Sequence, residues 1–237
     1  MTVPDLSTFS VAELADYYNA PSPDWVRSNM VISLDGHYVD DDYSSSALSS
    51  DVDLSVMRLL RAMSDVVVVG GLTVRQGHYA PRPIRPEFAE LGFTSPRLAI
   101  VSRSLNFDLS SDIFRNPESR PLILTTHSQD PLWAPRFVRL SPVAEVVVST
   151  EPISGSWIKD QLNQRNYRSI LSEGGPIVQD LLRRDYVLNE MDVTVAPMIM
   201  GFNGLGSPFG AFRNSLSLSA VAQGGSHLFM RYLCLER

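Results

Sequence analysis

The 237-residue sequence contains very little cysteine and lysine, and each scarcity excludes a class of site. Cys234 is the only cysteine. This excludes an internal disulfide and a cysteine cluster for zinc, and it suits a reducing cytoplasm, where we expect the protein to be located. Lys159 is the only lysine and lies in a helix-like stretch without a glycine loop. We therefore do not expect Schiff-base or phosphate-loop lysine chemistry.

A surplus of basic residues and long apolar runs are also missing. The formal net charge is −6, and the acidic residues are dispersed, which argues against a nucleic-acid partner. No stretch approaches the roughly 18 consecutive apolar residues of a membrane span, so we expect no membrane partner. The segment from Met1 to Asn19 has acidic residues and no basic start, so we do not expect a secretory signal.

Several catalytic signatures are absent as well. The sequence has no Gly-x-Gly-x-x-Gly fingerprint, no Gly-x-x-x-x-Gly-Lys-Ser/Thr loop and no Gly-x-Ser-x-Gly elbow. The four histidines are scattered, without a His-x-x-x-His pair or an acidic partner at metal spacing: His37, His78, His127 and His227. We expect neither a metal site nor a serine hydrolase.

What the sequence does contain is a glycine pair between a β-like run and a helical pattern. Ser172-Glu173-Gly174-Gly175-Pro176 follows the predicted strand 169–171 and precedes apolar residues at helical spacing. Paired glycines with proline at the first helical position leave backbone N–H groups free at a helix N-terminus, which favours an anion such as a diphosphate. A tight strand-to-helix turn without a ligand is the alternative interpretation.

A second glycine pair occurs upstream, in Val66-Val67-Val68-Val69-Gly70-Gly71-Leu72-Thr73-Val74-Arg75. Four consecutive valines indicate a strand buried on both faces of a sheet. Because open α/β sheets bind ligands beyond the carboxyl ends of their strands, two such turns favour a nucleotide cofactor.

The order of the predicted elements indicates one α/β domain with a mixed, mostly parallel sheet and helices on both faces. We predict a surface helix over 11–18 and interpret 80–95, which is rich in proline, as a loop or lid. The other predicted helices are 51–61, 156–166 and one beginning at Pro176, and the predicted strands are 27–33, 66–69, 97–101, 122–125, 145–148, 169–171, 190–196 and 226–235.

Four motifs in order resemble a known family. They are Ser33-Leu34-Asp35-Gly36, the Val69–Arg75 turn, Glu173-Gly174-Gly175-Pro176, and Asp192-Val193-Thr194-Val195-Ala196-Pro197 with Gly201. Together they resemble the reductase domain of the riboflavin-biosynthesis deaminase/reductase proteins, which has the dihydrofolate reductase fold. The resemblance runs from Trp25 to the C-terminus, so we predict an N-terminal extension over 1–24 and a reductase domain over 25–237.

Two departures from the family pattern concern the substrate. The zinc deaminase half has no counterpart, since there is no His-x-Glu followed by Pro-Cys-x-x-Cys. Gln76-Gly77-His78-Tyr79 replaces the family's Asp-Asp-Pro, which helps to hold the phosphorylated pyrimidine. This form looks like the stand-alone actinobacterial branch, which has been linked to dihydropteridine or dihydrofolate reduction.

The resemblance implies NADPH as cofactor, a homodimer, and a role for particular residues. Two residues have competing interpretations. Arg103, between two serines, is either a ligand of the ribose 2′-phosphate or a solvated surface arginine. Asp53 is either the acid that orients the substrate, as in dihydrofolate reductases, or an acid that complements the helix dipole or forms part of a capping box with Ser50. The residues implied to bind cofactor are Ser49, Gly70, Gly71, Thr73, Val74, Ser102, Arg103, Thr125, Glu173, Gly174, Gly175, Pro176 and Ile177, those implied to bind substrate are Asn29, Ser33, Asp53 and Arg75, and Asp53 is the candidate catalytic residue.

We interpret Asp35 as a residue that forms a turn with Gly36, because Asp-Gly pairs favour turns. Taken with the glycine turns, the resemblance implies an NADPH-dependent reductase that transfers hydride to a C=N bond of a pyrimidine or pterin. It resembles 5-amino-6-(5-phosphoribosylamino)uracil reductase. The alternatives are a dihydropteridine- or dihydrofolate-type reductase and a non-catalytic nucleotide-binding protein that kept the cofactor turns.

Overall fold

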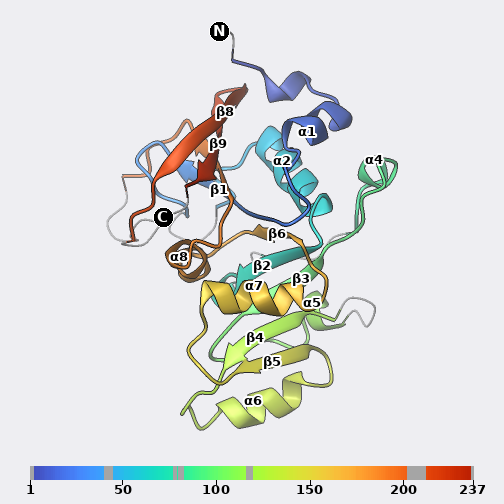
Figure 1. Ribbon diagram of the computed structural model, residues 1–237, viewed down its shortest axis with the longest axis vertical. Helices are drawn as coiled ribbons and strands as arrows, with labels where there is room; N and C mark the ends of the chain where they lie inside the picture. The colour runs from blue at the N-terminus through green and yellow to red at the C-terminus, as the bar shows by residue number, and fades with distance from the viewer. Residues whose placement is uncertain are drawn as a thin grey trace.

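The computed structural model describes residues 3–39, 45–76, 79, 83–115, 120–201 and 212–235 (Figure 1). Over these residues the chain forms one sheet in the order β5-β4-β3-β2-β6-β1-β7-β9-β8. Only β9 runs against its neighbours, β7 and β8, and the other pairings are parallel. The strands are β1 Trp25–Ser33, β2 Val66–Gly70, β3 Arg97–Val101, β4 Leu122–Thr126, β5 Glu145–Ser149, β6 Ser169–Ser172, β7 Glu190–Ala196, β8 Leu216–Gly224 and β9 His227–Cys234.

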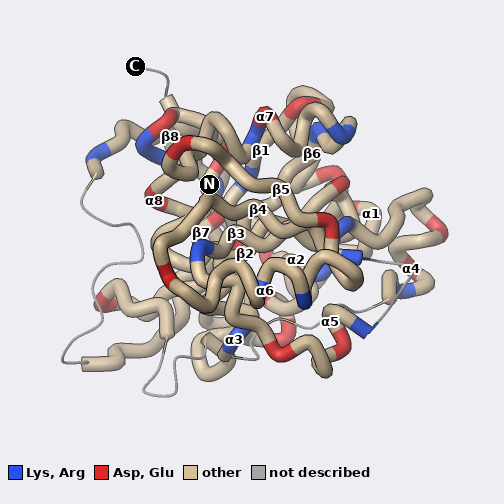
Figure 2. Tube along the Cα trace, turned by 90° about the horizontal axis from the view of Figure 1, so that it is seen from below, with Lys and Arg blue, Asp and Glu red and all other residues tan. Residues whose placement is uncertain are grey.

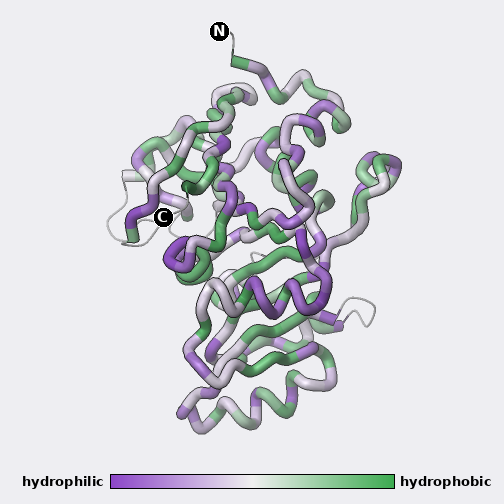
Figure 3. The backbone as a smooth tube through the Cα atoms, viewed as in Figure 1, coloured by the Kyte–Doolittle hydropathy of each residue, from purple (hydrophilic) through white to green (hydrophobic). Residues whose placement is uncertain are grey.

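Apolar side chains on both faces of the central strands fix this arrangement. Val67 and Val69 of β2 point into one apolar cluster, with side chains of α1, α2 and α6, while Val66 and Val68 point into another, with α7 and α8. The central strands form a hydrophobic band across the molecule (Figure 3). The helices are α1 Val11–Tyr17, α2 Asp51–Ala62, α3 Gly71–Arg75, α4 Pro86–Ala89, α5 Asp112–Arg115, α6 Trp133–Leu140, α7 Gly155–Asn163 and α8 Pro176–Arg184, and a 3₁₀ turn spans Leu6–Thr8. The predicted fold class, a mixed and mostly parallel sheet with helices on both faces, is confirmed.

The strand order places a crossover at the centre of the sheet. The chain passes from β1 to β2 through α2 and later inserts β6 between them, in register with both. The carboxyl ends of β1, β2, β3, β6 and β7 therefore meet along one edge, which we call the carboxyl edge. Ligands of open α/β sheets bind at such an edge, next to a change in strand order.

The structure corrects several predicted elements. The segment 80–95 contains the short helix α4, and the strand β8 and the helices α3, α5 and α6 were not predicted. The predicted helix 156–166 ends earlier, at Asn163, and Asn166 has a positive φ of 63° that breaks helical geometry. The predicted surface helix over 11–18 forms, but Leu14 and Tyr18 are buried in the core. The division of the chain at residue 24 stays a prediction.

Helices α7 and α8 pack against each other through Gly155. A β-carbon at Gly155 would lie 2.9 Å from the Leu182 Cα and from the backbone carbon of Leu181. Because these are backbone atoms, the helices would have to move apart. We expect Gly155→Ala to destabilise the fold by about 1–3 kcal/mol, the usual cost of overpacking. Urea unfolding measures this, and Ser156→Ala, at an exposed position of the same helix, is the control. Equal stabilities of the two variants would contradict the close packing.

Candidate functional site

The two glycine turns lie side by side at the carboxyl edge. The Gly70 N–H donates to the Gly174 carbonyl at 2.7 Å, and the Glu173 N–H donates to the Val68 carbonyl at 3.0 Å. A β-carbon at Gly70 would come within 3.3 Å of the Gly175 nitrogen. The sequence separates these turns by about a hundred residues, but β2 and β6 are neighbours in the sheet, so both turns contribute to one surface.

The second turn opens helix α8. Gly174 has a φ of +85°, its peptide bond to Gly175 is cis, and Gly175 is the N-cap without a side-chain hydrogen bond. Pro176 occupies the first helical turn, and the Ile177 side chain is 70% exposed. The helix therefore begins with backbone N–H groups that no side chain caps, and such groups favour a bound anion. The exposed Ile177 beside them could contact a ring attached to that anion.

Helix α3 continues the first turn toward β3. A β-carbon at Gly71 would lie 2.8 Å from the Ser102 side chain, and one at Gly175 would lie 3.6 Å from the Thr73 hydroxyl. The buried Ser102 hydroxyl has no hydrogen-bond partner among the described residues. Val74 is buried and anchors α3 in the core. Five predicted cofactor residues are thus brought together.

Three arginines surround the end of β3, and we call them the cationic end: Arg75, Arg103 and Arg136. Arg75 donates to the Ser104 hydroxyl at 3.2 Å, and Arg136 donates to the Ser104 carbonyl at 3.1 Å. Arg103 is exposed. Arg75, predicted as a substrate residue, therefore lies on the side of the predicted cofactor residues. Thr125 at the end of β4 is fully buried, and its hydroxyl donates to the Thr126 carbonyl at 3.3 Å.

The Glu173 side chain is engaged with a residue that the sequence analysis missed. Arg61, in the last turn of α2, donates from Nε and Nη2 to the two Glu173 carboxylate oxygens at 2.5 and 2.6 Å. The Tyr79 ring lies 4.8 Å from the Arg61 guanidinium carbon. This pairing fixes the glycine turn to α2, so Glu173 is placed to position the turn. In the segment 76–79, which differs from the family pattern, residues 77 and 78 lie outside the described residues.

Asp53 lies on the first turn of α2, at the other end of the same helix as Arg61. Its N–H donates to the Ser50 hydroxyl at 3.2 Å, so Ser50 caps the helix. The residue is buried, with 6% of its surface exposed, and its carboxyl group bonds to Thr194 of β7 and to Ser49. Burial raises the pKa of Asp53, and the Thr194 and Ser49 hydrogen bonds and the His227 charge offset part of the rise.

Ser49 therefore contacts Asp53, although it was predicted to bind cofactor. Asn29 of β1 is in register with Asp192, two residues before the Val31–Thr194 pair, so it shares the Thr194 face of the sheet. Ser33 is buried, donates to the Asp35 carboxylate at 2.5 Å and accepts from the His37 N–H at 2.9 Å.

Asp35 connects the segments that follow β1 and β7. It accepts from the backbone N–H groups of Met200 at 3.1 Å and Gly201 at 2.9 Å. The Ser33 hydrogen bond, followed by the Gly201 bond, holds the pKa of Asp35 well below its usual range. The predicted turn former therefore also holds two neighbouring loops together, and Ser33 supports that turn.

Asp53 bonds to Thr194 of β7, which lies three strand-to-strand steps from the Gly70 turn on β2 and two steps from the Gly174 turn on β6. At about 4.8 Å per step these spans are roughly 14 Å and roughly 10 Å, and an extended dinucleotide covers both. No group of three or more His, Cys, Asp or Glu that could hold a metal ion occurs in the described part of the chain.

Comparison with known proteins adds evidence that the geometry does not provide. Residues 24–225 match the model of the RibD C-terminal domain family. The riboflavin biosynthesis protein RibD of Synechocystis sp. is 24% identical over 211 residues, which cover 86% of this chain and 55% of that protein. The chain thus spans about half the length of this curated relative.

Two of the solved structures that this chain resembles come from bacteria. A pyrimidine reductase-like protein from Corynebacterium diphtheriae superposes with a TM-score of 0.84 at 25% identity, over 94% of this chain and 99% of that one. A Thermotoga maritima diaminohydroxyphosphoribosylaminopyrimidine deaminase/5-amino-6-(5-phosphoribosylamino)uracil reductase gives 0.67 at 19% identity, over 89% and 56%. The family resemblance predicted from the four motifs is confirmed. With most of its length matched by the family model, this chain belongs to the RibD C-terminal domain family.

Proposed function

We propose that this protein is an NADPH-dependent oxidoreductase that reduces a C=N bond of a pyrimidine or pterin. Family membership and the similarity to a pyrimidine reductase-like protein support a reductase. One observation carries the proposal: two hydrogen-bonded glycine turns and a buried carboxyl group lie along one edge of a parallel sheet.

The residues at the carboxyl edge fit NADPH, and different groups of them would bind its different parts. Uncapped N–H groups at the start of α8 and the unpaired Ser102 hydroxyl would hold the diphosphate, and the cationic end would hold the 2′-phosphate. When bound, NADPH supplies the hydride. Asp53 would accept N–H groups of the substrate ring and keep a proton close to it, because burial favours its protonated form.

The Asp53 environment also favours the dihydropteridine- or dihydrofolate-type alternative, since a buried carboxyl group suits the paired N–H donors of a pterin. A panel that contains 5-amino-6-(5-phosphoribosylamino)uracil, dihydropterins and dihydrofolate tests the proposal, with NADPH oxidation measured at 340 nm. Oxidation with at least one member is expected. Cofactor binding without oxidation of NADPH by any member would favour a non-catalytic nucleotide-binding protein.

The cationic end predicts the choice of cofactor. We expect Arg103→Ala to weaken NADPH binding about ten- to a hundredfold, because it removes one charge-assisted contact to the 2′-phosphate, and to leave NADH binding unchanged. Titration calorimetry with both cofactors measures this, and Arg139→Ala, at an exposed position on α6, is the control. Equal binding of NADH and NADPH by the wild type would contradict the assignment.

The glycine turn predicts a second effect on binding. Gly175→Val adds a side chain whose β-carbon makes an ordinary 3.6 Å contact with Thr73, at a φ of −68° that valine adopts. We expect the fold to survive and NADPH binding to weaken at least about tenfold, since the side chain blocks the main-chain approach of the diphosphate. Calorimetry and circular dichroism test this together. Wild-type affinity in a folded variant would make the turn purely structural.

The cytoplasmic location and the homodimer implied by the resemblance belong to the same proposal. No helix in the described part of the chain is long and apolar enough to cross a membrane. Acidic and basic residues are interspersed along the described part of the trace (Figure 2). Together with the formal net charge of −6, this supports a small-molecule substrate over nucleic acid. Light scattering coupled to gel filtration measures the oligomeric state.

A further inference from the structure

An aromatic ring outside the site described above lies next to the cationic end. His127 directly follows β4, and the carboxyl end of β4 lies beside that of β3 because the two strands are parallel neighbours. The His127 side chain is exposed, and its ring centroid lies 5.2 Å from that of Trp133, with the two planes inclined by 46°. His127 therefore adds an exposed flat ring to the carboxyl edge.

Buried aromatic rings support His127 from below. Trp133 opens helix α6, is only 8% exposed, and belongs to the same apolar cluster as Ile123 of β4. Its ring stacks on Phe137, with the centroids 5.4 Å apart and the planes inclined by 13°. Helix α6 runs along β5 next to β4 (Figure 1). Because the rings beneath His127 are packed in the core, a ligand that covers it meets a preformed surface.

Arg136 connects this surface to the cationic end. Its Nη1 donates to the Ser104 carbonyl at 3.1 Å, beyond β3, and to the Asp130 carboxylate at 2.9 Å, in the loop that carries His127. Asp130 also accepts from the Leu132 N–H at 2.9 Å, at the start of α6. One guanidinium group thus joins the segment after β3 to the loop after β4.

Exposed aromatic rings are rare on this side of the molecule. Among the described residues from 71 to 168, every phenylalanine, tyrosine and tryptophan is buried or half-buried, and only His127 has an exposed aromatic ring. Phe107, which follows β3, is half-buried and packs on Phe114 with ring centroids 5.5 Å apart. A base bound beyond β3 or β4 would therefore find its aromatic partner in His127.

The order of groups along the carboxyl edge fits a dinucleotide that lies across the strands. Asp53 is beside β7, the glycine turns end β6 and β2, the cationic end follows β3, and His127 follows β4. In NADPH the 2′-phosphate and the adenine are attached to the same ribose. If the cationic end holds that phosphate, the next strand end, about 4.8 Å further along, is within reach of the base.

From this arrangement we infer that the adenine base of the cofactor stacks on His127, with Trp133 as the buried support beneath it. Aromatic side chains bind bases because every base has a flat π-face. The inference rests on the proposed NADPH-dependent function. It adds a contact that does not depend on the 2′-phosphate, so it acts on NADH as well as on NADPH.

The first test removes the ring. We expect His127→Ala to weaken NADPH, NADH and adenosine 2′,5′-bisphosphate by the same factor, about tenfold, because all three contain adenine. Arg103→Ala should instead leave NADH binding unchanged, so the two variants separate the base contact from the phosphate contact. Titration calorimetry measures the dissociation constants. The control is Val138→Ala, at a 68% exposed position of α6, and circular dichroism checks that each variant is folded.

A second test distinguishes stacking from a structural role. His127→Phe keeps a flat ring and should restore most of the affinity that His127→Ala loses. In proton NMR of the wild type, the His127 Cε1 proton is identified by its absence from His127→Phe. This signal should move upfield during titration with adenosine 2′,5′-bisphosphate, because a stacked ring shields protons above its face.

The outcomes separate the inference from the proposed function. If the wild type binds NADPH and His127→Ala binds it equally well, the inference is overturned and the proposed function stands. An affinity of His127→Phe as low as that of His127→Ala, or a His127 signal that does not move upfield, would also overturn stacking. If the wild type binds neither NADPH nor NADH, the proposed cofactor fails and the inference fails with it.

Discussion

Asp53→Asn is expected to lower the rate of substrate reduction about a hundredfold or more, the usual scale for a lost proton-transfer or orienting group. Asparagine keeps the size of the side chain and one acceptor oxygen, so the contacts to Thr194 and Ser49 have a partner. It cannot hold the proton or the negative charge that the ring N–H groups meet. NADPH affinity should stay within about threefold, because the glycine turns lie two and three strand-to-strand steps away, roughly 10 to 14 Å.

The matched control is Asp51→Asn on the same first turn of α2. Asp51 is exposed, whereas Asp53 is buried. Asp51→Asn loses one charge at the helix N-terminus, which should cost about 0.3–1 kcal/mol of stability. Only Asp53→Asn should lose turnover. Equal turnover in the two variants would show that Asp53 only complements the helix dipole and does not act on the substrate.

A pH profile of activity distinguishes two roles of Asp53, holding a proton and only orienting the substrate. Because burial raises the pKa of Asp53, the carboxyl group stays protonated to a higher pH than an exposed aspartate. We expect kcat/KM of the wild type to fall as pH rises through that pKa. The profile of Asp53→Asn should lack this fall, while any other titrations remain in both.

The glycine turns could be predicted because local sequence determines them. Four valines before Gly70 indicate a strand buried on both faces, and Pro176 after Gly175 marks the first turn of a helix. Parallel strands then bring both turns to one edge. Strand β8 had a comparable signal in its alternating Leu216, Ser217 and Leu218, which the sequence analysis did not use.

The contacts that shape the site could not be predicted in this way. Arg61 meets Glu173 only because α2 packs across the sheet, and 112 positions separate the two residues. Asp53 and Thr194 come together because β7 pairs with β1, a pairing that strand order alone decides. A single sequence contains no record of such pairings.

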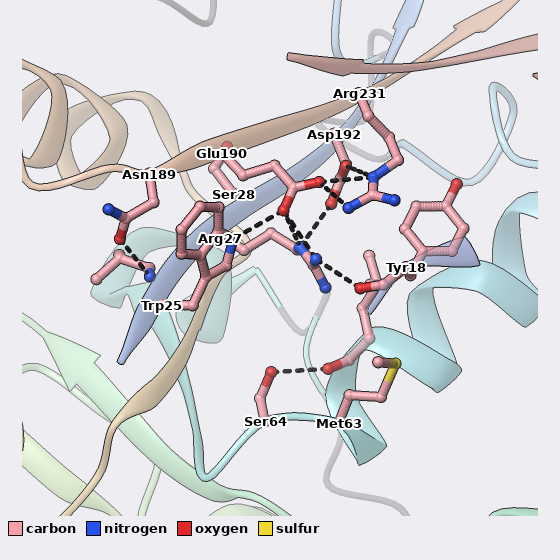
Figure 4. Close-up of polar contacts among 12 residues, drawn as sticks. Tyr18, Trp25, Arg27, Ser28, Met63, Ser64, Asn189, Glu190, Asp192 and Arg231 are labelled. Carbon is pink, nitrogen blue, oxygen red and sulfur yellow. Dashed lines mark hydrogen bonds and ion pairs between the residues drawn. The ribbon is translucent and has the colours of Figure 1, made fainter. Parts of the chain in front are cut away.

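Glu190→Gln is expected to destabilise the fold by about 3–5 kcal/mol, the usual cost of breaking a buried ion pair. Glu190 is fully buried and accepts from Trp25 at 2.7 Å, from Arg27 at 2.8 and 3.1 Å, and from Arg231 at 2.6 Å (Figure 4). Burial opposes its ionisation, but the Arg27 and Arg231 charges outweigh it, so the pKa of Glu190 is lowered. Glutamine removes the charge and presents an N–H group to these donors.

Asp192, in the same cluster, is the matched control. Its carboxylate lies 3.0 Å from the Arg27 Nε and 3.7 Å from the Arg231 Nε, but neither oxygen has a hydrogen bond of good geometry among the described residues. Burial, opposed by Arg27, raises its pKa to about 8. Since asparagine resembles the protonated acid, Asp192→Asn should change stability at pH 7 by less than about 1 kcal/mol. Urea unfolding compares the two variants, and equal losses would contradict the division of roles.

The pH dependence of stability gives the same pair a second, independent readout. An unfolded aspartate has a pKa of about 3.9, so the folded protein binds one more proton at Asp192 between that value and its folded pKa of about 8. The free energy of unfolding should therefore fall as pH rises from about 5 to about 8, and Asp192→Asn should remove this fall. Glu190 acts in the opposite direction, because its lowered pKa contributes stability that is lost only when pH drops below about 4.3. Identical slopes for wild type and Asp192→Asn above pH 5 would show that Arg27 and Arg231 keep both carboxylates ionised.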